Sequence, residues 1–257
     1  MTRSFEQLLA EGMAEPVTGW DFSWLAGRAT EERPSWGYAR MLTERLGSAA
    51  AALDLQTGGG EVFAEVLGSL PRPPATVAAT ESWPPNIELA RANLRPFGGS
   101  VALVAEDAAL PFEGGTFDLV ASRHPTVTDW TEIARVLRPG GRYLSQGIGS
   151  GSNRELTEAI MGPVPVDDPT WARQAVAGAE AAGLIVLDLR TESLRAEFHD
   201  IGAVVYFLRK VPWTVPGFSV ERDRERLAEL HERIRAEGQF VAHAERFLIE
   251  ARKPDPS

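Results

Sequence analysis

Short apolar runs alternate with helical patterns along most of this 257-residue chain, beginning near residue 50. Apolar runs bounded by glycine, proline or polar residues are typical of buried strands, and apolar residues spaced three or four apart predict amphipathic helices. Alternation of the two predicts βα units and a parallel sheet. The strands predicted in this way are Ala50–Leu55, Thr76–Thr80, Val101–Ala105, Thr116–Ala121, Arg142–Ile148, Leu184–Arg190 and Phe240–Ala251.

The helical patterns fill the gaps between these strands. A stop signal, Arg138-Pro139-Gly140-Gly141, follows one of them and predicts a turn. The last pattern, Arg222–Ala236, mixes acids and arginines along its length, which indicates a solvated face rather than a binding patch. The other predicted helices are Glu61–Leu67, Asn86–Leu94, Val127–Leu137, Asn153–Ile160, Trp171–Ala182 and Ile201–Arg209.

The first 45 residues are rich in aromatic side chains set among polar residues and glycines. They predict an N-terminal helical cap over residues 1–45, which either packs onto the sheet or forms a lid over a substrate pocket. Residues 46–257 then form the main domain, in which the less regular segment at about 150–220 defines the substrate. The aromatic residues of the predicted cap are Trp20, Phe22, Trp24, Trp36 and Tyr38.

Composition narrows the class of protein. The chain has no cysteine, which excludes disulfides, thiolate catalysis and cysteine-ligated zinc. No apolar run is long enough to span a bilayer and the N-terminus is not a signal peptide, so we expect a cytoplasmic protein without membrane contact. The net charge of −10 disfavours a nucleic-acid partner, because such partners usually require a basic surface. We expect a monomer or a homodimer.

The motif with most chemical content is the segment Leu53-Asp54-Leu55-Gln56-Thr57-Gly58-Gly59-Gly60-Glu61. It joins an apolar strand to a helix. Its glycines allow a ligand to approach the backbone closely, and the helix N-terminus offers free N–H groups. A glycine-rich loop by itself is also consistent with a plain tight turn.

Two acids follow this loop at the ends of the next two predicted strands. Glu81 closes the second strand, where a carboxylate can accept both hydroxyls of a ribose. Asp107 follows the third strand and precedes Leu110-Pro111-Phe112, where an acid can accept from an adenine amino group. The order of these features is more specific than any one of them.

With Phe117-Asp118-Leu119-Val120 and Leu137-Arg138-Pro139-Gly140-Gly141 added, residues 35–150 resemble the class I S-adenosylmethionine-dependent methyltransferases. The nearest resemblance is to the broad group that includes the ubiquinone and menaquinone-biosynthesis methyltransferases. The resemblance implies an α/β, Rossmann-like fold. Its sheet has seven strands, mostly parallel with the last antiparallel. It also implies S-adenosyl-L-methionine as cofactor and S-adenosyl-L-homocysteine as product.

The same resemblance assigns roles to single residues. Asp54 would lie near the methionine amino group, Glu81 would bind the ribose, and Asp107 the adenine. Gln56 stands where the family usually has the first glycine of the loop, so its side chain either crowds or contacts the cofactor. The other positions expected to contact the cofactor are Thr57, Gly58, Gly60, Ser82, Ala108 and Ser122.

The acceptor side is predicted from Ser122-Arg123-His124-Pro125, which follows the fourth strand at its carboxyl end. His124 is the candidate general base and Arg123 the candidate group that orients an acidic substrate. His199 beside Asp200 is a second candidate base, and no metal site is predicted, because neighbouring residues on a helix do not share a face.

Three functions are compatible with these patterns. The first is methyl transfer to oxygen, nitrogen or carbon of a small molecule. The second is methylation of rRNA or tRNA, which the acidic net charge and the absence of an Asn/Asp-Pro-Pro-aromatic motif disfavour. The third is a non-catalytic regulatory protein that binds the cofactor. A Rossmann dehydrogenase is disfavoured, because the glycines at 58, 59 and 60 do not form the G-x-G-x-x-G pattern.

Overall fold

The computed structural model describes residues 3–17, 21–165 and 171–256, and Trp20 of the predicted cap lies outside them. The chain forms two compact units. We call Pro34–Ile148, Thr170–Glu192 and Arg246–Ser257 the sheet unit. We call Met1–Arg33, Gly149–Pro169 and Ser193–Glu245 the helical unit. Two long strands contribute residues to both.

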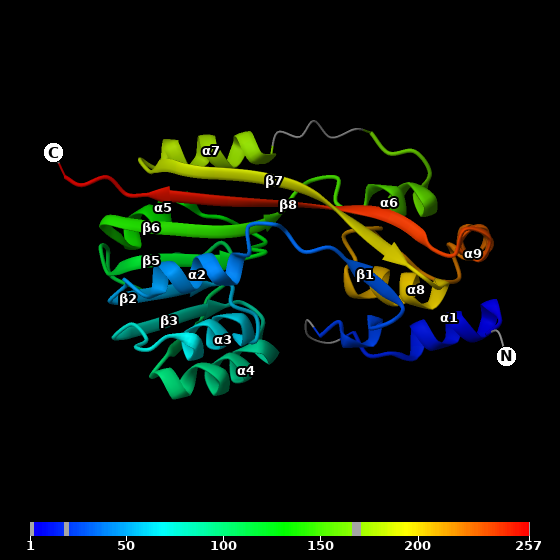
Figure 1. The fold of residues 1–257 in the computed structure, drawn as a ribbon, viewed down its shortest axis with the longest axis horizontal. Helices are drawn as coiled ribbons and strands as arrows, with labels where there is room; N and C mark the ends of the chain where they lie inside the picture. The colour runs from blue at the N-terminus through cyan, green and yellow to red at the C-terminus, as the bar shows by residue number, and fades with distance from the viewer. Residues whose placement is uncertain (1–2, 18–20, 166–170, 257) are drawn as a thin grey trace. The chain divides into compact units, whose positions relative to one another are not determined.

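The strands join in the order β1-β7-β8-β6-β5-β2-β3-β4 (Figure 1). Strands β2, β3, β4, β5 and β6 pair in parallel, whereas β8 runs antiparallel to β6 and β1 antiparallel to β7. The bounds of the strands are β1 Ala29–Glu31, β2 Ala51–Leu55, β3 Thr76–Glu81, β4 Ser100–Leu103, β5 Phe117–Arg123, β6 Leu137–Ile148, β7 Ile185–Phe198 and β8 Phe240–Arg252.

The Rossmann-like α/β fold is confirmed, but the sheet has eight strands where seven are expected. The additional strand is β1, whose three residues pair with residues 196–198 at the end of β7. It carries no apolar run, so it exists through its backbone pairing rather than through a pattern of its own. β6 also begins at Leu137, so the segment Arg138–Gly141 that predicts a turn lies within a strand.

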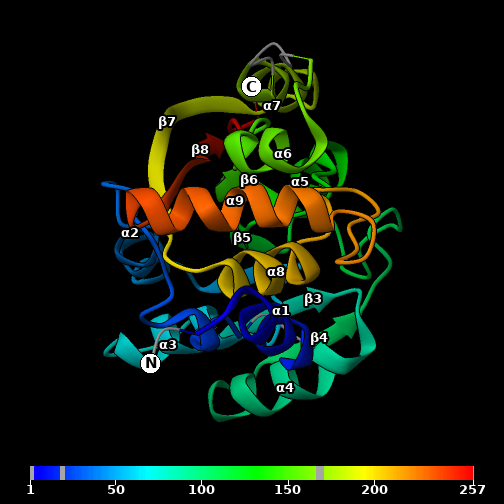
Figure 2. The same ribbon diagram turned by 90° about the vertical axis from the view of Figure 1, so that its right-hand side faces the viewer.

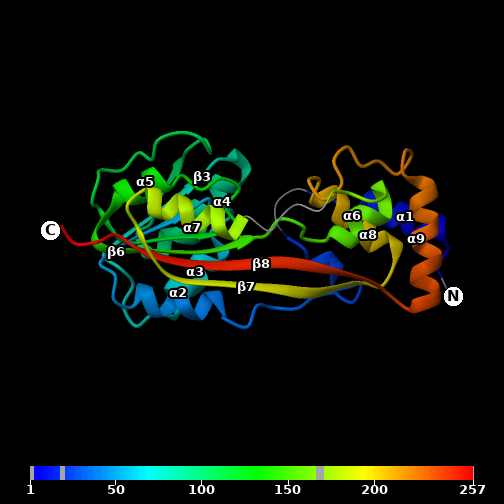
Figure 3. The ribbon, with the colours of Figure 1, turned by 90° about the horizontal axis from the view of Figure 1, so that it is seen from above.

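Helices cover both faces of the parallel strands. Apolar side chains of α2 (Tyr38–Leu46), α3 (Glu61–Ser69) and α4 (Pro84–Leu94) share one buried cluster with one face of the sheet. Those of α5 (Trp130–Val136) and α7 (Trp171–Ala181) share a second cluster with the opposite face (Figure 3). The sheet unit therefore has the three-layer architecture in which ligands bind at the carboxyl ends of the strands.

Two helices differ from their predicted bounds because of the residues at their N-termini. α5 begins at Trp130, since the Asp129 carboxylate accepts from the backbone N–H groups of Thr131 and Glu132 and so caps the helix. α4 begins at Pro84, because proline is favoured in the first turn of a helix. The backbone N–H that proline lacks would have no acceptor within the helix at this position. The segment before each helix is thereby left as a loop at the edge of the sheet.

The helical unit has its own core. It is built from α1 (Phe5–Ala14), α6 (Arg154–Met161), α8 (Ile201–Lys210) and α9 (Arg224–Glu237), whose apolar faces meet in one buried cluster (Figure 2). A short 3-10 helix, Ser23–Leu25, precedes β1. Among the described residues, no helix is long and apolar enough to cross a membrane.

The predicted cap over residues 1–45 is divided between the two units. Residues up to Arg33 belong to the helical unit, and α2 belongs to the sheet unit, where Trp36 is 1% exposed. The segment at about 150–220 is divided as well, because α7 and the first half of β7 belong to the sheet unit. Periodicity along the chain carries no information on which core an apolar face joins.

Candidate functional site

The loop after β2 makes a tight turn into α3. Gly58 and Gly60 have positive φ angles of 63° and 78°, and Gly60 N–H donates to the Thr57 carbonyl at 3.0 Å. A Cβ at Gly60 would lie 3.3 Å from the Cα of Ala90 in α4, so glycine also allows the two helices to approach. The turn leaves the start of α3 at the carboxyl edge of the sheet.

Asp54 lies near the end of β2 and is 7% exposed. Its carboxylate accepts a 2.6 Å hydrogen bond from the Thr57 hydroxyl. Burial raises the pKa of Asp54 to about 7, although the Thr57 hydrogen bond and the charge of Arg123 act in the opposite direction. Among the described residues no cationic side chain bonds to this carboxyl group, which is therefore suited to a ligand that brings a positive charge.

Glu81 ends β3 and is buried. Its Oε2 accepts from Gly58 N–H at 2.7 Å, and its Oε1 accepts from the N–H groups of Ser82 and Trp83 at 3.0 and 2.9 Å. Three of the four lone-pair sites of the carboxylate are therefore in use. Glu81 holds the glycine loop against the end of β3, and one site on Oε2 stays available for a hydroxyl donor.

Gln56 keeps a backbone conformation that glycine would adopt without strain, with φ at 53°. Its side chain crosses from the β2 loop to the loop after β5. The Oε1 atom accepts from the backbone N–H and the hydroxyl of Thr126, at 2.7 and 2.8 Å, and Nε2 donates to the Val127 carbonyl at 2.6 Å. We call these three bonds the Gln56 clamp.

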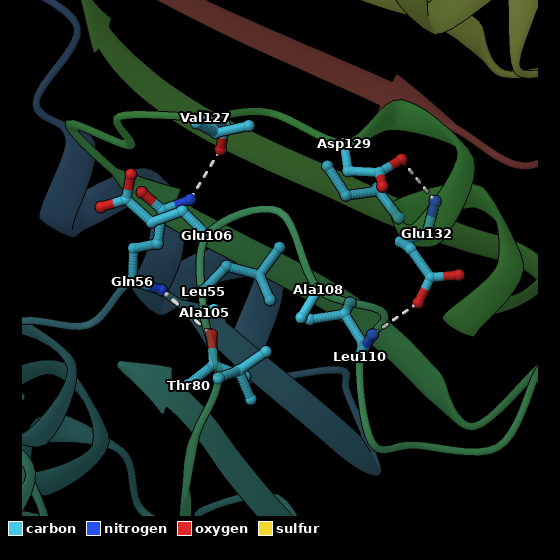
Figure 4. Close-up of a pocket in the computed structure, with 12 residues that line it drawn as sticks. Leu55, Gln56, Thr80, Ala105, Glu106, Ala108, Leu110, Val127, Asp129 and Glu132 are labelled. Carbon is cyan, nitrogen blue, oxygen red and sulfur yellow. Dashed lines mark hydrogen bonds between the residues drawn. The ribbon is translucent and has the colours of Figure 1, made fainter. Parts of the chain in front are cut away.

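A pocket lies at the carboxyl ends of β2, β3 and β4, and the Gln56 clamp forms part of its wall (Figure 4). Ala108 lines this pocket as predicted, whereas Asp107 is exposed and does not. Three acids that sequence reasoning does not single out, Glu106, Asp129 and Glu132, line it as well. The remaining lining residues are Leu55, Thr80, Val104, Ala105, Leu110, Val127 and Ile133.

Of the positions expected to contact the cofactor, Gln56 and Ala108 line this pocket. Ser82 and Ser122 lie outside the lining, as do Asp54, Thr57, Gly58, Gly60, Glu81 and Asp107. The Ser82 hydroxyl is 3.4 Å from Glu106 Oε1. Ser122 is fully buried, and its hydroxyl contacts the hydroxyls of Tyr143 at 2.7 Å and Ser145 at 2.9 Å. Its role toward a cofactor stays a prediction, and its visible role is to fix β5 against β6.

Arg123 is the last residue of β5 and is exposed. Among the residues that the structure describes, no carboxylate pairs with its guanidinium at hydrogen-bonding distance. Its positive charge still acts on two side chains of the interior, since it contributes to lowering the pKa of Asp54 and that of His124. An exposed guanidinium without a carboxylate partner among the described residues, at the carboxyl end of a strand, is suited to an anionic ligand.

His124 follows Arg123 in a left-handed conformation, with φ at 57°. Its backbone N–H donates to the Gln146 carbonyl at 2.7 Å, and its Nε2 lies 3.0 Å from Gln146 Nε2. Burial, followed by the charges of Arg123 and Arg246, lowers the pKa of His124 to about 3. Its role as a general base stays a prediction.

The second candidate base lies in the helical unit. Asp200, next to His199, caps α8 by accepting from Ala203 N–H and is bonded to the Arg28 guanidinium at 2.7 and 2.8 Å. These bonds occupy both carboxylate oxygens of Asp200. Asp200 therefore has a structural role in this unit, and the role of His199 as a base stays a prediction.

The site residues can be compared with known proteins at the level of sequence. Residues 53–145 match the family model described as a methyltransferase domain, which covers the glycine loop, both acids and the loop after β5. No curated protein matches the chain. The match does not separate the ubiquinone and menaquinone-biosynthesis group from other members.

Solved structures with the same fold are similar over most of their length. The YcgJ protein of Bacillus subtilis has a TM-score of 0.58 and 14% identity, and covers 85% of this chain and 99% of its own. A candidate methyltransferase of Bacillus halodurans has a TM-score of 0.56 and 17% identity, with coverages of 86% and 99%. The [4+2]-cyclase SpnF has a TM-score of 0.53 and 17% identity, with coverages of 99% and 98%. At these identities the likeness concerns the fold.

Proposed function

We propose that this S-adenosylmethionine-dependent methyltransferase transfers a methyl group to a small organic acid. The methyltransferase domain and the shared fold support the enzyme class. The observation that carries the choice of acceptor is the exposed, unpaired guanidinium of Arg123 at the carboxyl end of β5. In sheets of this kind the ligands bind at that edge.

The residues present fit the cofactor at three points. In the part of the chain that the structure describes, no cation is bonded to the Asp54 carboxyl group, and a methionine ammonium would supply one. Glu81 Oε2 keeps one acceptor site for a ribose hydroxyl. The pocket that Ala108 lines, at the carboxyl ends of the strands, is the candidate position of the adenine. When bound, the cofactor supplies an electrophilic methyl group on a positively charged sulfur.

The chain's own contribution to methyl transfer is positioning. Transfer is an in-line displacement, so its rate depends on holding the acceptor close to the methyl carbon and opposite the sulfur. Arg123 can bind a carboxylate in two parallel hydrogen bonds and so fix its direction. The Gln56 clamp joins the glycine loop to Thr126 and Val127, in the loop that follows Arg123.

Binding of the cofactor is tested first by calorimetry with S-adenosylmethionine and S-adenosylhomocysteine. We expect affinities on the order of micromolar for the wild type, and weaker binding by roughly tenfold or more for Asp54→Asn, which removes the carboxylate charge that would face the methionine ammonium. The exposed Glu113→Gln makes the same change away from the site and is the matched control, which should bind normally. Absence of binding to the wild type at millimolar ligand would contradict the proposal.

Arg123→Ala should affect the acceptor and spare the cofactor. Loss of a charge-assisted, two-point contact should raise the KM for a carboxylic acid by roughly tenfold to a hundredfold. The affinity for S-adenosylhomocysteine should change little. The measurement is transfer of a labelled methyl group to benzoate and hexanoate, with phenol, benzylamine and a tRNA fraction as competing classes. Equal KM values in both proteins, or transfer to tRNA alone, would argue against an acidic small-molecule acceptor.

A further inference from the structure

Three side chains of the sheet unit form a continuous hydrogen-bonded relay. The indole Nε1–H of Trp36 donates to Gln146 Oε1 at 2.8 Å, and Gln146 Nε2 lies 3.0 Å from His124 Nε2. Trp36 is 1% exposed and Gln146 is 4% exposed, so water does not compete for these bonds. The direction of every bond in the relay then follows from the chemistry of its first member.

An indole N–H is a donor only, so the group that faces it must be the oxygen of the Gln146 amide. The amide NH₂ is thereby turned toward His124, and it has no capacity to accept. His124 Nε2 must accept that bond and therefore carries no proton. In a neutral imidazole the proton is then on Nδ1. Protonation of Nε2 would set one N–H against another.

We propose that Trp36 and Gln146 are positioning residues that hold His124 as the neutral Nδ1–H tautomer, so that it meets the acceptor as a hydrogen-bond donor and not as a general base. The backbone supports the same geometry, because His124 N–H donates to the Gln146 carbonyl in spite of the positive φ of His124. The acceptor part of this inference rests on the proposed function, whereas the state of the ring does not.

The charges around the ring favour its neutral form. Two guanidinium groups, those of Arg123 and Arg246, face His124, and together with burial they hold its pKa far below the usual range. Without a base at this position, the acceptor atom must bring a lone pair that is available before any proton is lost. A carboxylate oxygen satisfies this condition. It bonds to the methyl carbon as the carbon–sulfur bond breaks, the electron pair passes to sulfur, and the products are a methyl ester and a neutral thioether.

Nitrogen NMR of the imidazole rings tests the proposal directly. The full chain has four histidines, so histidine labelled with ¹⁵N gives a simple long-range spectrum. For His124 we expect a lone-pair shift at Nε2, a protonated shift at Nδ1, and no titration between about pH 5.5 and pH 8.

Two variants change the relay without removing the histidine. Gln146→Glu replaces the amide NH₂ by a carboxylate oxygen, which should move the His124 proton to Nε2 and raise the pKa of the ring into the observable range. Trp36→Phe removes the donor that fixes the amide, which should give a mixture of tautomers. His243, bonded to Glu155 in the helical unit, is the internal control and should not change.

The proposal is overturned if wild-type His124 is protonated at Nε2 or titrates near pH 6.5, since either result restores it as a base. It is also overturned if Gln146→Glu leaves the tautomer unchanged. Both readings are made without cofactor or acceptor. A failed calorimetric titration would therefore contradict the proposed function and leave the ring assignment standing.

Discussion

Asp54→Asn is expected to make the protein more stable than the wild type above neutral pH, and to abolish most of its affinity for S-adenosylmethionine. The folded pKa of Asp54 is about 7, against an unperturbed value of 3.8. The folded state therefore binds a proton more tightly than the unfolded state does. The contribution of Asp54 to stability is present below the unfolded value and falls as the pH rises from about 4 to about 7.

The size of the effect follows from the shift. It corresponds to about 4 kcal/mol above pH 7, as an order of magnitude, and asparagine avoids this cost while it still accepts from Thr57. Urea unfolding of both proteins at about pH 5 and about pH 8 should show a change of about 2–3 kcal/mol in the difference between them, because part of the cost is already present at pH 5. Subtracting the stability of the wild type from that of Asp54→Asn at each pH cancels the opposite pH dependence of Glu250 and Asp200. Burial acts to raise the folded pKa values of these two carboxyl groups, but hydrogen bonds from Arg45 and Arg28 lower them below their usual values.

The exposed Asp107→Asn serves as control for this experiment, and its stability should follow the wild type at both pH values. If the difference between wild type and Asp54→Asn is the same at both pH values, the raised pKa is refuted. The loss of cofactor affinity in Asp54→Asn is measured separately from stability, because it depends on the ammonium group of the ligand as well as on the folded protein.

Glu81→Gln is expected to destabilise the protein by about 2–3 kcal/mol, although the side chain keeps its size. The glutamine oxygen can still accept from Ser82 and Trp83, but the amide NH₂ then faces the N–H of Gly58, donor against donor. A backbone N–H is left without an acceptor, and the three bonds lose the charge that strengthens them.

Denaturant midpoints of wild type and Glu81→Gln measure this effect. Glu88→Gln, on the exposed face of α4, changes the same functional group where it is solvated and should shift stability by less than about 0.5 kcal/mol. Equal stability of Glu81→Gln and Glu88→Gln would mean that the carboxylate does not hold the glycine loop. Cofactor affinity should fall in the first variant only.

Elements with their own local signal could be predicted from the sequence. α8 is predicted as Ile201–Arg209 and found as Ile201–Lys210, because a capping aspartate precedes an apolar run. The end of β7 could have been predicted, since Leu194, Ala196 and Phe198 are buried at every second position. β1 could not, because its strand conformation depends on pairing with a segment far away in the chain.

The same distinction applies to the site. Asp54, Glu81 and the glycine loop are recognisable because each lies at the end of a strand with a readable pattern. The relay joins residues 110 positions apart, Trp36 and Gln146, and no local pattern relates them. Asp107 shows the limit of a motif, since the acid is at the expected position in the chain and yet the neighbouring Glu106 and Ala108 line the pocket.

The Gln56 clamp predicts how two positions vary together among homologous sequences. A glutamine in a left-handed conformation is retained only while its side chain compensates the strain, here through Thr126 and Val127. In relatives with glycine at this position the strain and the clamp are both absent, so the residue at position 126 has no partner to satisfy. The identities of positions 56 and 126 should therefore covary among homologues, with glutamine accompanied by a hydroxyl side chain and glycine by a wider range of residues.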